Sequence, residues 1–336
     1  MRSLLVTAGL VGLATAAAVA QTHTIVVLSH TDNTAYELDP TTGTIAHRFT
    51  AVNQPHEGVA SADGKTFYMA IPNGPHVVIL DATTFKEKGR IESEYFHSSK
   101  ENGSASPHGS ALTTDGSKLY VGLENADVPG IVVYDTKAGK VLKKIDVMLR
   151  GGHFLAIQPG TDKLYYPMRD DNRVLVIDTK TDRIVKIVPV EGGPVGVGFA
   201  PNGDVWIHDD GDGKVHVIDS AKDAVVKTID SQGKGAGRMA VSPNGQWAAS
   251  THGGTQDVAI FDASKKTVAA TVPLGKGPGF PIFSPDSSKL YVMNYGEGDV
   301  AIVDLASMKV VARHKVGATP FGGGLRFPNG RPTSQD

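Results

Sequence analysis

Three of the twelve histidines in this chain stand in closely similar surroundings, which makes them the first candidates for chemistry. They are His56 in QPHEG, His108 in SPHGS and His153 in GGHFL. Neutral imidazole is a common ligand of zinc and copper, and three converging imidazoles with one open position form a usual metal site. If the fold brings these positions together, the sequence predicts a metal or catalytic centre. The alternative is that the rings only form hydrogen bonds to loop backbones.

The three histidines occupy one position of a repeat that runs through the chain. Each repeat opens on a proline or small residue, and the openings are Pro55, Pro107, Gly152, Pro194, Ala236, Pro278 and Pro320. From Gly152 onward, successive openings are 42 residues apart. A second marker is a strand that ends in aspartate, at Asp39, Asp81, Asp135, Asp178, Asp219, Asp262 and Asp304. Two independent markers that both occur seven times indicate a repeat protein.

The unit that begins at Pro278 shows what each repeat builds. It contains the apolar runs GFPIFS, KLYVMN, DVAIVD and KVVARHKV, which are separated by SPDSS, YGEGD and LASM. Alternating apolar residues with turns rich in Gly, Pro, Asp and Ser predict four antiparallel strands. Four strands in about 40–45 residues is typical of a β-propeller blade. Since a single blade cannot bury both faces, the blades must pack around a ring.

The two ends of the chain together supply one more blade. The last repeat contributes one strand, FGGGLRF, and the N-terminal part contributes three, HTIVVLSH, TAYELD and TIAHRFT. We therefore expect an all-β, seven-bladed β-propeller whose last blade is closed by N-terminal strands and one C-terminal strand. Such a ring leaves no free sheet edge at the closure. We expect one domain over residues 21–330 and a disordered tail over 331–336.

More histidines are expected on the face where the inner strands begin. The loop between the second and third strands of a blade opens on that face, and it carries His30, His208 and His252. The metal-ligand candidates are therefore His56, His108, His153, His30, His252 and His208. Four histidines in or beside outer strands are expected to be structural, and they are His47, His76, His216 and His314.

Charged residues also reach this face. Glu57 follows His56 and could act as a ligand, an orienting carboxylate or a base, although strand alternation would direct it away from His56. Arg238 and Arg169 could hold an anionic substrate, so these three are the catalytic candidates. Glu124 belongs to a rim loop, where such charges are usually solvated. Asp209 to Gly213 is rich in oxygen ligands but lacks the spacing of an EF-hand.

Residues 92–106, ESEYFHSSKENGSAS, form an insertion between two repeats. Its position predicts either a flap over the histidine-bearing face, carrying His97, or an ordinary surface loop.

The N-terminal residues predict the compartment, and the overall composition excludes several kinds of ligand and cross-link. Met1 to Ala20 is a short Ala-rich apolar run that ends in Ala18-Val19-Ala20, which predicts a cleavable signal peptide, with an uncleaved anchor as the alternative. We expect an exported protein, periplasmic or secreted, with no membrane span after cleavage. The formal net charge of −2 falls by one to −3 when Arg2 leaves, too near neutral for nucleic-acid binding by bulk charge. The absence of cysteine excludes disulfides, thioether-linked haem and thiolate ligands. We expect a monomer.

The segments SPDSSKLYVMNYGEGDVAIVD, SPNGQWAAS and KLYYPMRDDNRVLVIDTKTDRIV resemble the YVTN-repeat β-propellers, and the resemblance covers the chain after the leader. This exported family includes lactonase-like proteins, copper- or haem-containing reductase domains, heavy chains of amine dehydrogenases and periplasmic zinc metallochaperones. The metallochaperones bind zinc through histidines on one face of the ring. The resemblance therefore implies a divalent transition metal, with zinc favoured over copper.

Three functions remain open at this point. The first is metal binding or delivery through the histidine cluster. The second is a metal-dependent lactonase or lyase, with a histidine as base and Arg238 or Arg169 holding an anionic substrate. The third is a face that docks a protein partner without metal. The residues do not decide whether the protein is an enzyme.

Overall fold

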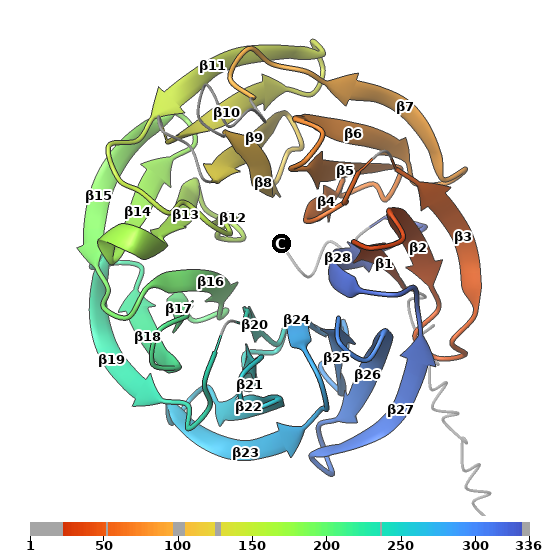
Figure 1. The fold of residues 1–336 in the computed structure, drawn as a ribbon. Coiled ribbons are helices and arrows are strands. Elements are labelled where there is room, and N and C mark those ends of the chain that lie inside the picture. The colour runs from red at the N-terminus through yellow and green to blue at the C-terminus, as the bar shows by residue number, and fades with distance from the viewer. Residues whose placement is uncertain (1–22, 52, 97–104, 125–128, 236, 331–336) are drawn as a thin grey trace, which may run out of the picture.

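A computed structural model describes residues 23–51, 53–96, 105–124, 129–235 and 237–330. Within this part of the chain, seven four-stranded antiparallel sheets surround a central axis (Figure 1). The predicted all-β, seven-bladed propeller is confirmed. The predicted signal peptide at 1–20 and tail at 331–336 lie outside the described residues. No helix in the described ranges is long and apolar enough to cross a membrane.

The blades follow one another around the ring, and each runs from an inner to an outer strand. The closing blade contains β28 (Pro320–Arg326), β1 (Thr24–Ser29), β2 (Thr34–Leu38) and β3 (Ile45–Thr50). The next two contain β4 (Gly58–Ala60), β5 (Thr66–Ile71), β6 (His76–Asp81) and β7 (Lys86–Ile91), then β8 (Ser106–Leu112), β9 (Lys118–Glu124), β10 (Gly130–Asp135) and β11 (Lys140–Asp146).

The other four blades follow the same plan. They contain β12 (Ala156–Ile157), β13 (Lys163–Met168), β14 (Arg173–Asp178) and β15 (Arg183–Pro189), then β16 (Pro194–Phe199), β17 (Asp204–Asp209), β18 (Lys214–Asp219) and β19 (Ala224–Asp230). The last two contain β20 (Met239–Val241), β21 (Trp247–His252), β22 (Asp257–Asp262) and β23 (Thr267–Pro273), then β24 (Pro278–Phe283), β25 (Lys289–Asn294), β26 (Asp299–Asp304) and β27 (Lys309–Lys315). A short 3-10 helix, η1 (Arg169–Asp171), links β13 to β14.

The repeated aspartates cap the turn between the third and fourth strands of each blade. In β6, the Asp81 carboxylate accepts hydrogen bonds from the backbone N–H groups of Thr83 and Thr84, at 2.9 and 2.8 Å. The carboxylates of Asp135 and Asp178 accept equivalent bonds. A short side chain that satisfies turn N–H groups favours this sharp reversal, which explains the regular spacing of the aspartates.

The hydrophobic core is divided among the contacts between neighbouring blades. In one cluster, Tyr120 and Val133 of one blade pack with Leu164 and Leu175 of the next. In contrast, the outer strands alternate partly buried and exposed residues, as in β27. Burial between sheets therefore holds the ring together, as expected when a lone blade cannot cover its faces.

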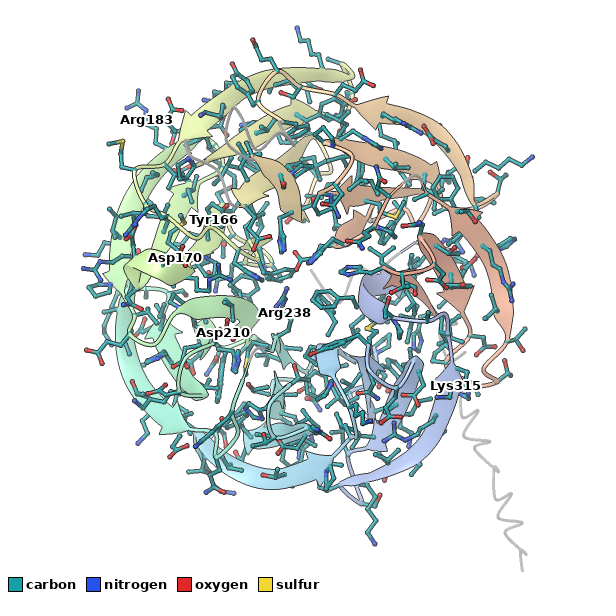
Figure 2. All side chains as sticks on the ribbon, in the orientation of Figure 1. Tyr166, Asp170, Arg183, Asp210, Arg238 and Lys315 are labelled. Atoms are coloured by element: carbon teal, nitrogen blue, oxygen red, sulfur yellow. The ribbon has the colours of Figure 1, made fainter. Side chains whose placement is uncertain are left out.

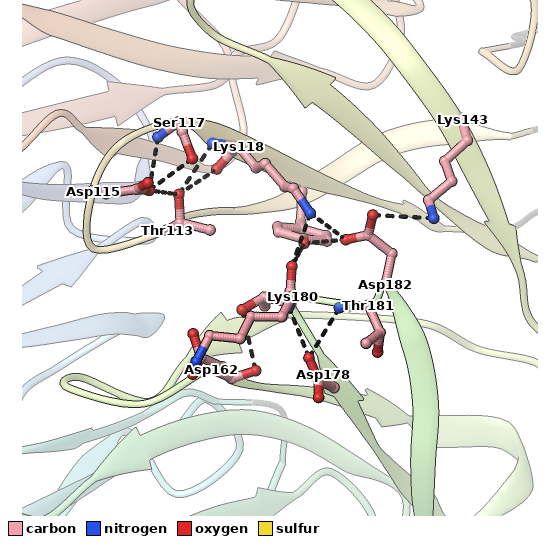
Figure 3. Close-up of polar contacts among 12 residues, drawn as sticks. Thr113, Asp115, Ser117, Lys118, Lys143, Asp162, Asp178, Lys180, Thr181 and Asp182 are labelled. Carbon is pink, nitrogen blue, oxygen red and sulfur yellow. Dashed lines mark hydrogen bonds and ion pairs between the residues drawn. The ribbon is translucent and has the colours of Figure 1, made fainter.

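Polar contacts between neighbouring blades reinforce this packing (Figure 3). Lys118 Nζ and Tyr120 Oη of β9 donate to Asp182 Oδ1 in the next blade, at 2.9 and 2.5 Å, and Lys143 Nζ lies 3.1 Å from Asp182 Oδ2. One blade further on, Lys163 donates to Asp223 at 2.8 Å. The hollow beside Lys118 is also lined by Asp115, which accepts a hydrogen bond from Thr113, and by the ion pair of Lys180 with Asp162, so its charges already have partners.

The closing blade joins the two ends of the chain. β28 pairs with β1 in antiparallel register, as predicted. The buried Glu37 carboxylate accepts hydrogen bonds from Thr24, His47 and Arg326, and Arg326 Nε also donates to the Gly64 carbonyl at 3.0 Å. A fully paired buried carboxylate stabilises this seam, because each donor offsets the cost of burying the charge.

Candidate metal centre

The first three inner strands after the closing blade begin with irregular backbone, and three histidines come together at these beginnings. His56 lies before β4 and His108 lies at a register shift in β8. His153 follows Gly152, which forms an isolated bridge to Met168. Only glycine fits at 152, because a Cβ there would lie 2.1 Å from Tyr166 Oη.

The imidazole rings form a continuous row. The ring centroids of His56 and His108 are 4.2 Å apart, and those of His108 and His153 are 4.7 Å apart. His30, from the loop between β1 and β2, extends the row with its centroid 4.8 Å from that of His56. Phe321 of β28 stacks on His30 at 4.4 Å. The repeat equivalence thus correctly indicated that the trio would meet, and His30 lies beside it.

Two glutamates lie against this row. Glu57 Oε2 is 3.4 Å from His108 Nδ1, and Glu57 Oε1 is 3.9 Å from His56 Nδ1. Glu124 Oε2 is 3.2 Å from His108 Nε2, and Glu124 Oε1 is 3.9 Å from His153 Nε2. The cluster therefore contains two groups of potential ligands, in each of which the ligand atoms lie within 4.8 Å of one another. These five residues are called the mouth cluster below: His56, Glu57, His108, Glu124 and His153.

The predicted direction of Glu57 is wrong. Strand alternation was expected to turn it away from His56, but β4 begins only at Gly58, so Glu57 precedes the strand and alternation does not apply. Its side chain is buried, and its Oε1 accepts a hydrogen bond from Arg238 Nη2 at 3.0 Å. The predicted placement of Glu124 in a rim loop is also wrong. Glu124 ends β9 instead of lying in a loop, and that strand pairs with the one that carries His108.

Arg238 joins the mouth cluster from the opposite side and lies beside the centre of the ring (Figure 2). Besides Glu57, its guanidinium bonds the Gly237 carbonyl at 3.2 Å and lies 5.8 Å from the centroid of the Phe321 ring. Arg169 is placed differently. It starts η1, and its Nε bonds Asp170 Oδ1 at 3.1 Å, outside both ligand groups. Of the two arginine candidates, only Arg238 contacts the mouth cluster.

Burial and charge together set the protonation of the mouth cluster. Burial lowers the pKa of His56 and of His153 well below the ordinary value, with the charges of His108 and Arg238 acting in the same direction. Burial also lowers the pKa of His108, but Glu57 and Glu124 outweigh it and raise the net value. Burial would raise the pKa of Glu57, yet His108 and Arg238 hold it well below its usual range. The neutral imidazoles of His56 and His153 beside a carboxylate are suitable donors for a divalent metal, which would displace the proton that the glutamates favour on His108.

Several buried polar atoms at this place have no hydrogen-bond partner. Among the described residues they are His30 Nε2, His56 Nδ1, His153 Nδ1 and Arg238 Nε, while Glu57 Oε2 and His108 Nδ1 face only each other at 3.4 Å. A buried polar atom without a partner costs about 1–3 kcal/mol, and native structures contain few of them. Their convergence on one place favours a bound species that accepts or shares these lone pairs.

His208 and His252 do not join the mouth cluster. They form a second group with Ser231, Ser250 and Asp257, which we call the seam cluster. His252 bonds Ser231 Oγ through Nε2 and Asp257 Oδ1 through Nδ1, both at 2.8 Å, and His208 Nδ1 bonds Ser250 Oγ at 2.7 Å. The order of serine, histidine and aspartate is that of a hydrolytic triad.

The surroundings of Ser231 favour a structural role for this second group. Ser231 is fully buried, and its hydroxyl is also bonded to the Gly213 carbonyl. A nucleophile must reach its substrate, which a buried serine does not. The loop after β17 is structural as well, because Asp209 accepts bonds from the N–H groups of Asp212 and Gly213.

The insertion at 92–106 is described only in part. Phe96 and Ala105 are buried in the cluster between two blades. His97 and the residues up to 104 lie outside the described residues, so the predicted flap is not tested.

Comparison with known proteins identifies the fold. No family model and no curated protein matches the chain. Among solved structures, Kuenenia stuttgartiensis hydrazine synthase is 23% identical, with a TM-score of 0.71 over 84% of this chain and 94% of that chain. A protein of unknown function from Desulfotomaculum acetoxidans DSM 771 is 14% identical, with a TM-score of 0.75 over 91% and 99%. A candidate 6-phosphogluconolactonase from Bacteroides fragilis NCTC 9343 is 17% identical, with a TM-score of 0.72 over 91% and 98%. At these identities the likeness concerns the seven-bladed fold alone.

Proposed function

We propose that this protein binds one divalent transition metal ion in the mouth cluster and acts in metal binding or delivery. The observation that carries the proposal is the convergence of imidazole and carboxylate ligand atoms in two largely buried groups that share His108, together with the Nδ1 atoms of His56 and His153 that have no hydrogen-bond partner. A metal ion accepts such lone pairs directly, and its binding offsets the cost of burying them.

The donor set favours zinc over copper. Each ligand group combines two imidazoles with one carboxylate, which is a usual three-residue set for zinc with a fourth position open. Copper(I) prefers thiolate or thioether sulfur, and the two ligand groups contain only histidine and glutamate. Copper(II) also binds imidazole well, so it is the metal against which zinc is to be tested.

Delivery requires ligands that another molecule can reach. The side chains of His56 and Glu124 are each 17% exposed, whereas those of Glu57 and His108 are 2% exposed. An ion held between them has a buried side and a side toward solvent, which suits exchange with a protein partner that docks on this face. The apolar leader predicted at 1–20 would place this exchange outside the cytoplasm, in the periplasm or after secretion.

The direct test is the metal content of protein purified without an affinity tag. We expect about one zinc ion per chain in the wild type, by analogy with sites of this donor set. The folded triple variant His56→Ala/His108→Ala/His153→Ala should hold none. His76→Ala, which changes a histidine outside the mouth cluster, is the matched control and should keep the ion. If the wild type takes up neither zinc nor copper on titration, the proposal is wrong.

Arg238 supports a second candidate, a metal-dependent lactonase or lyase. Its guanidinium lies beside the ligands, and its Nε has no partner, so it could bind the carboxylate of an anionic substrate. Zinc-loaded protein should then hydrolyse small lactones, and Arg238→Gln should raise KM more than it lowers kcat. Zinc transfer to an acceptor without any turnover would favour delivery.

A further inference from the structure

His108 is the one residue that the two ligand groups of the mouth cluster share. Its Nδ1 lies 3.4 Å from Glu57 Oε2, and its Nε2 lies 3.2 Å from Glu124 Oε2. Each glutamate has a second histidine of its own, His56 on one side and His153 on the other, and both separations are 3.9 Å. A single buried ring therefore presents one nitrogen to each half of the cluster.

We propose that the mouth cluster holds one divalent ion at a time in two alternative positions, one on each side of the His108 ring. The two positions differ in their ligands. The first is formed by His56, Glu57 and His108 Nδ1, and the second by His108 Nε2, Glu124 and His153. This inference rests on the proposed metal-binding function. It adds a route along which a delivered ion can move.

When the ion occupies one position, the glutamate of the other position can accept a hydrogen bond from the free ring nitrogen of His108. A histidine that binds metal through one nitrogen usually donates its other N–H to a carboxylate, which fixes the ring and its tautomer. With the ion on Nδ1, the Nε2–H of His108 faces Glu124. With the ion on Nε2, the Nδ1–H faces Glu57. The proton lost from one nitrogen is replaced by one gained at the other, through water or the adjacent carboxylate, so the proton count and the charge of the metal do not change.

The local charges favour one ion over two. Two ions would require His108 to lose its last ring proton and would place two dications in a buried site with only two carboxylates. Arg238 adds a further positive charge next to Glu57. Repulsion between dications in such a site is strong, because the surroundings screen it weakly. Since Arg238 already donates a hydrogen bond to Glu57, that carboxylate is less available to a metal ion. We therefore expect the ion to occupy the position at Glu124 more of the time.

Cobalt(II) alone is the probe, because its visible absorption depends on its ligands. It is titrated into the purified full chain, into His56→Ala and His153→Ala, into the double variant and into His108→Ala, with His76→Ala as control. Wild type and both single variants should each bind one ion, and the two single variants should have different spectra. His56→Ala should weaken binding by less than about ten-fold and His153→Ala by more, while the double variant and His108→Ala lose at least about a hundred-fold.

Two results would overturn the two-position site while leaving metal binding intact. One is a wild type that binds two ions, and the other is a single variant that loses binding as completely as the double variant. A wild type that binds neither cobalt nor zinc would instead overturn the metal-binding function itself. Circular dichroism shows whether each variant is folded, and His56→Gln and His153→Gln replace any alanine variant that is not.

Discussion

The mouth cluster and the seam cluster contain the same residue type near the same face of the ring, yet their hydrogen bonding differs. In the seam cluster, both nitrogens of His252 have partners, Ser231 and Asp257, although Nε2 of His208 has none. In the mouth cluster, His56 and His153 each have an Nδ1 atom without one. Histidines whose nitrogens are satisfied by the protein stabilise the fold, whereas histidines that converge without partners are free to bind a ligand. The number of histidines alone does not separate the two cases.

The sharpest way to test this comparison is to remove one histidine from each cluster. His108→Ala should weaken zinc binding by at least about a hundred-fold, because both ligand groups lose a member. His252→Ala should leave zinc affinity unchanged within about two-fold, since its partners belong to the protein. Isothermal titration with zinc measures both. Equal losses of affinity in the two variants would contradict the separation of the clusters.

In the metal-free protein, acid should affect His30, beside the mouth cluster, and His208, in the seam cluster, down to different pH values. Burial lowers the pKa of His30 to about 4 and that of His208 to about 3. A histidine with a lowered pKa contributes stability that is fully present above its unfolded pKa of about 6.5 and lost as the pH falls toward the folded value. We expect the free energy of unfolding to fall by about 2–3 kcal/mol for His30 between pH 6.5 and 4.

Urea unfolding across this pH range is the measurement. His30→Gln should be less sensitive to acid than the wild type down to pH about 4, and His208→Gln should remain less sensitive at lower pH. A free energy of unfolding that rises on acidification would contradict the lowered pKa values of His30 and His208.

A matched pair of carboxamide variants separates affinity from stability. Glu124→Gln should lower zinc affinity by about 10- to 100-fold with little change in stability, because Glu124 is a ligand in one position and a support in the other. Asp257→Asn should leave the affinity unchanged, because Asp257 contacts only His252 within the seam cluster. Zinc titration measures the affinity of each variant, and thermal unfolding measures its stability.

The smallest effect is expected in the seam cluster alone. Ser231→Ala removes the hydroxyl that bonds His252 Nε2 and should reduce the free energy of unfolding by about 1–3 kcal/mol, because a buried nitrogen loses its partner. Chemical denaturation measures the loss. A hydrolytic activity in the wild type that Ser231→Ala abolishes would instead mean that this group is catalytic.

Repeat spacing predicted the blade count, the shared closing blade and the common position of His56, His108 and His153, because these depend on strand number and equivalence between repeats. The contacts of Glu57 and Glu124 were not predictable in the same way. The first depends on β4 being only three residues long, and the second on β9 extending to Glu124. His208 and His252 were expected in the loops after the second strands, but they lie within β17 and β21. Ser231, the partner of His252, lies between two blades, where repeat equivalence carries no information.

The seam between β1 and β28 has a consequence for how the protein folds. Thr24 pairs with Arg326, so the ring cannot close until nearly the whole chain has been made. Pairings between such distant segments form slowly, because a long loop must be ordered first. Phe321, which stacks on His30, lies on that last strand. The surroundings of the mouth cluster are therefore completed at the end of folding, so a chain that has only begun to fold would not yet sequester an ion.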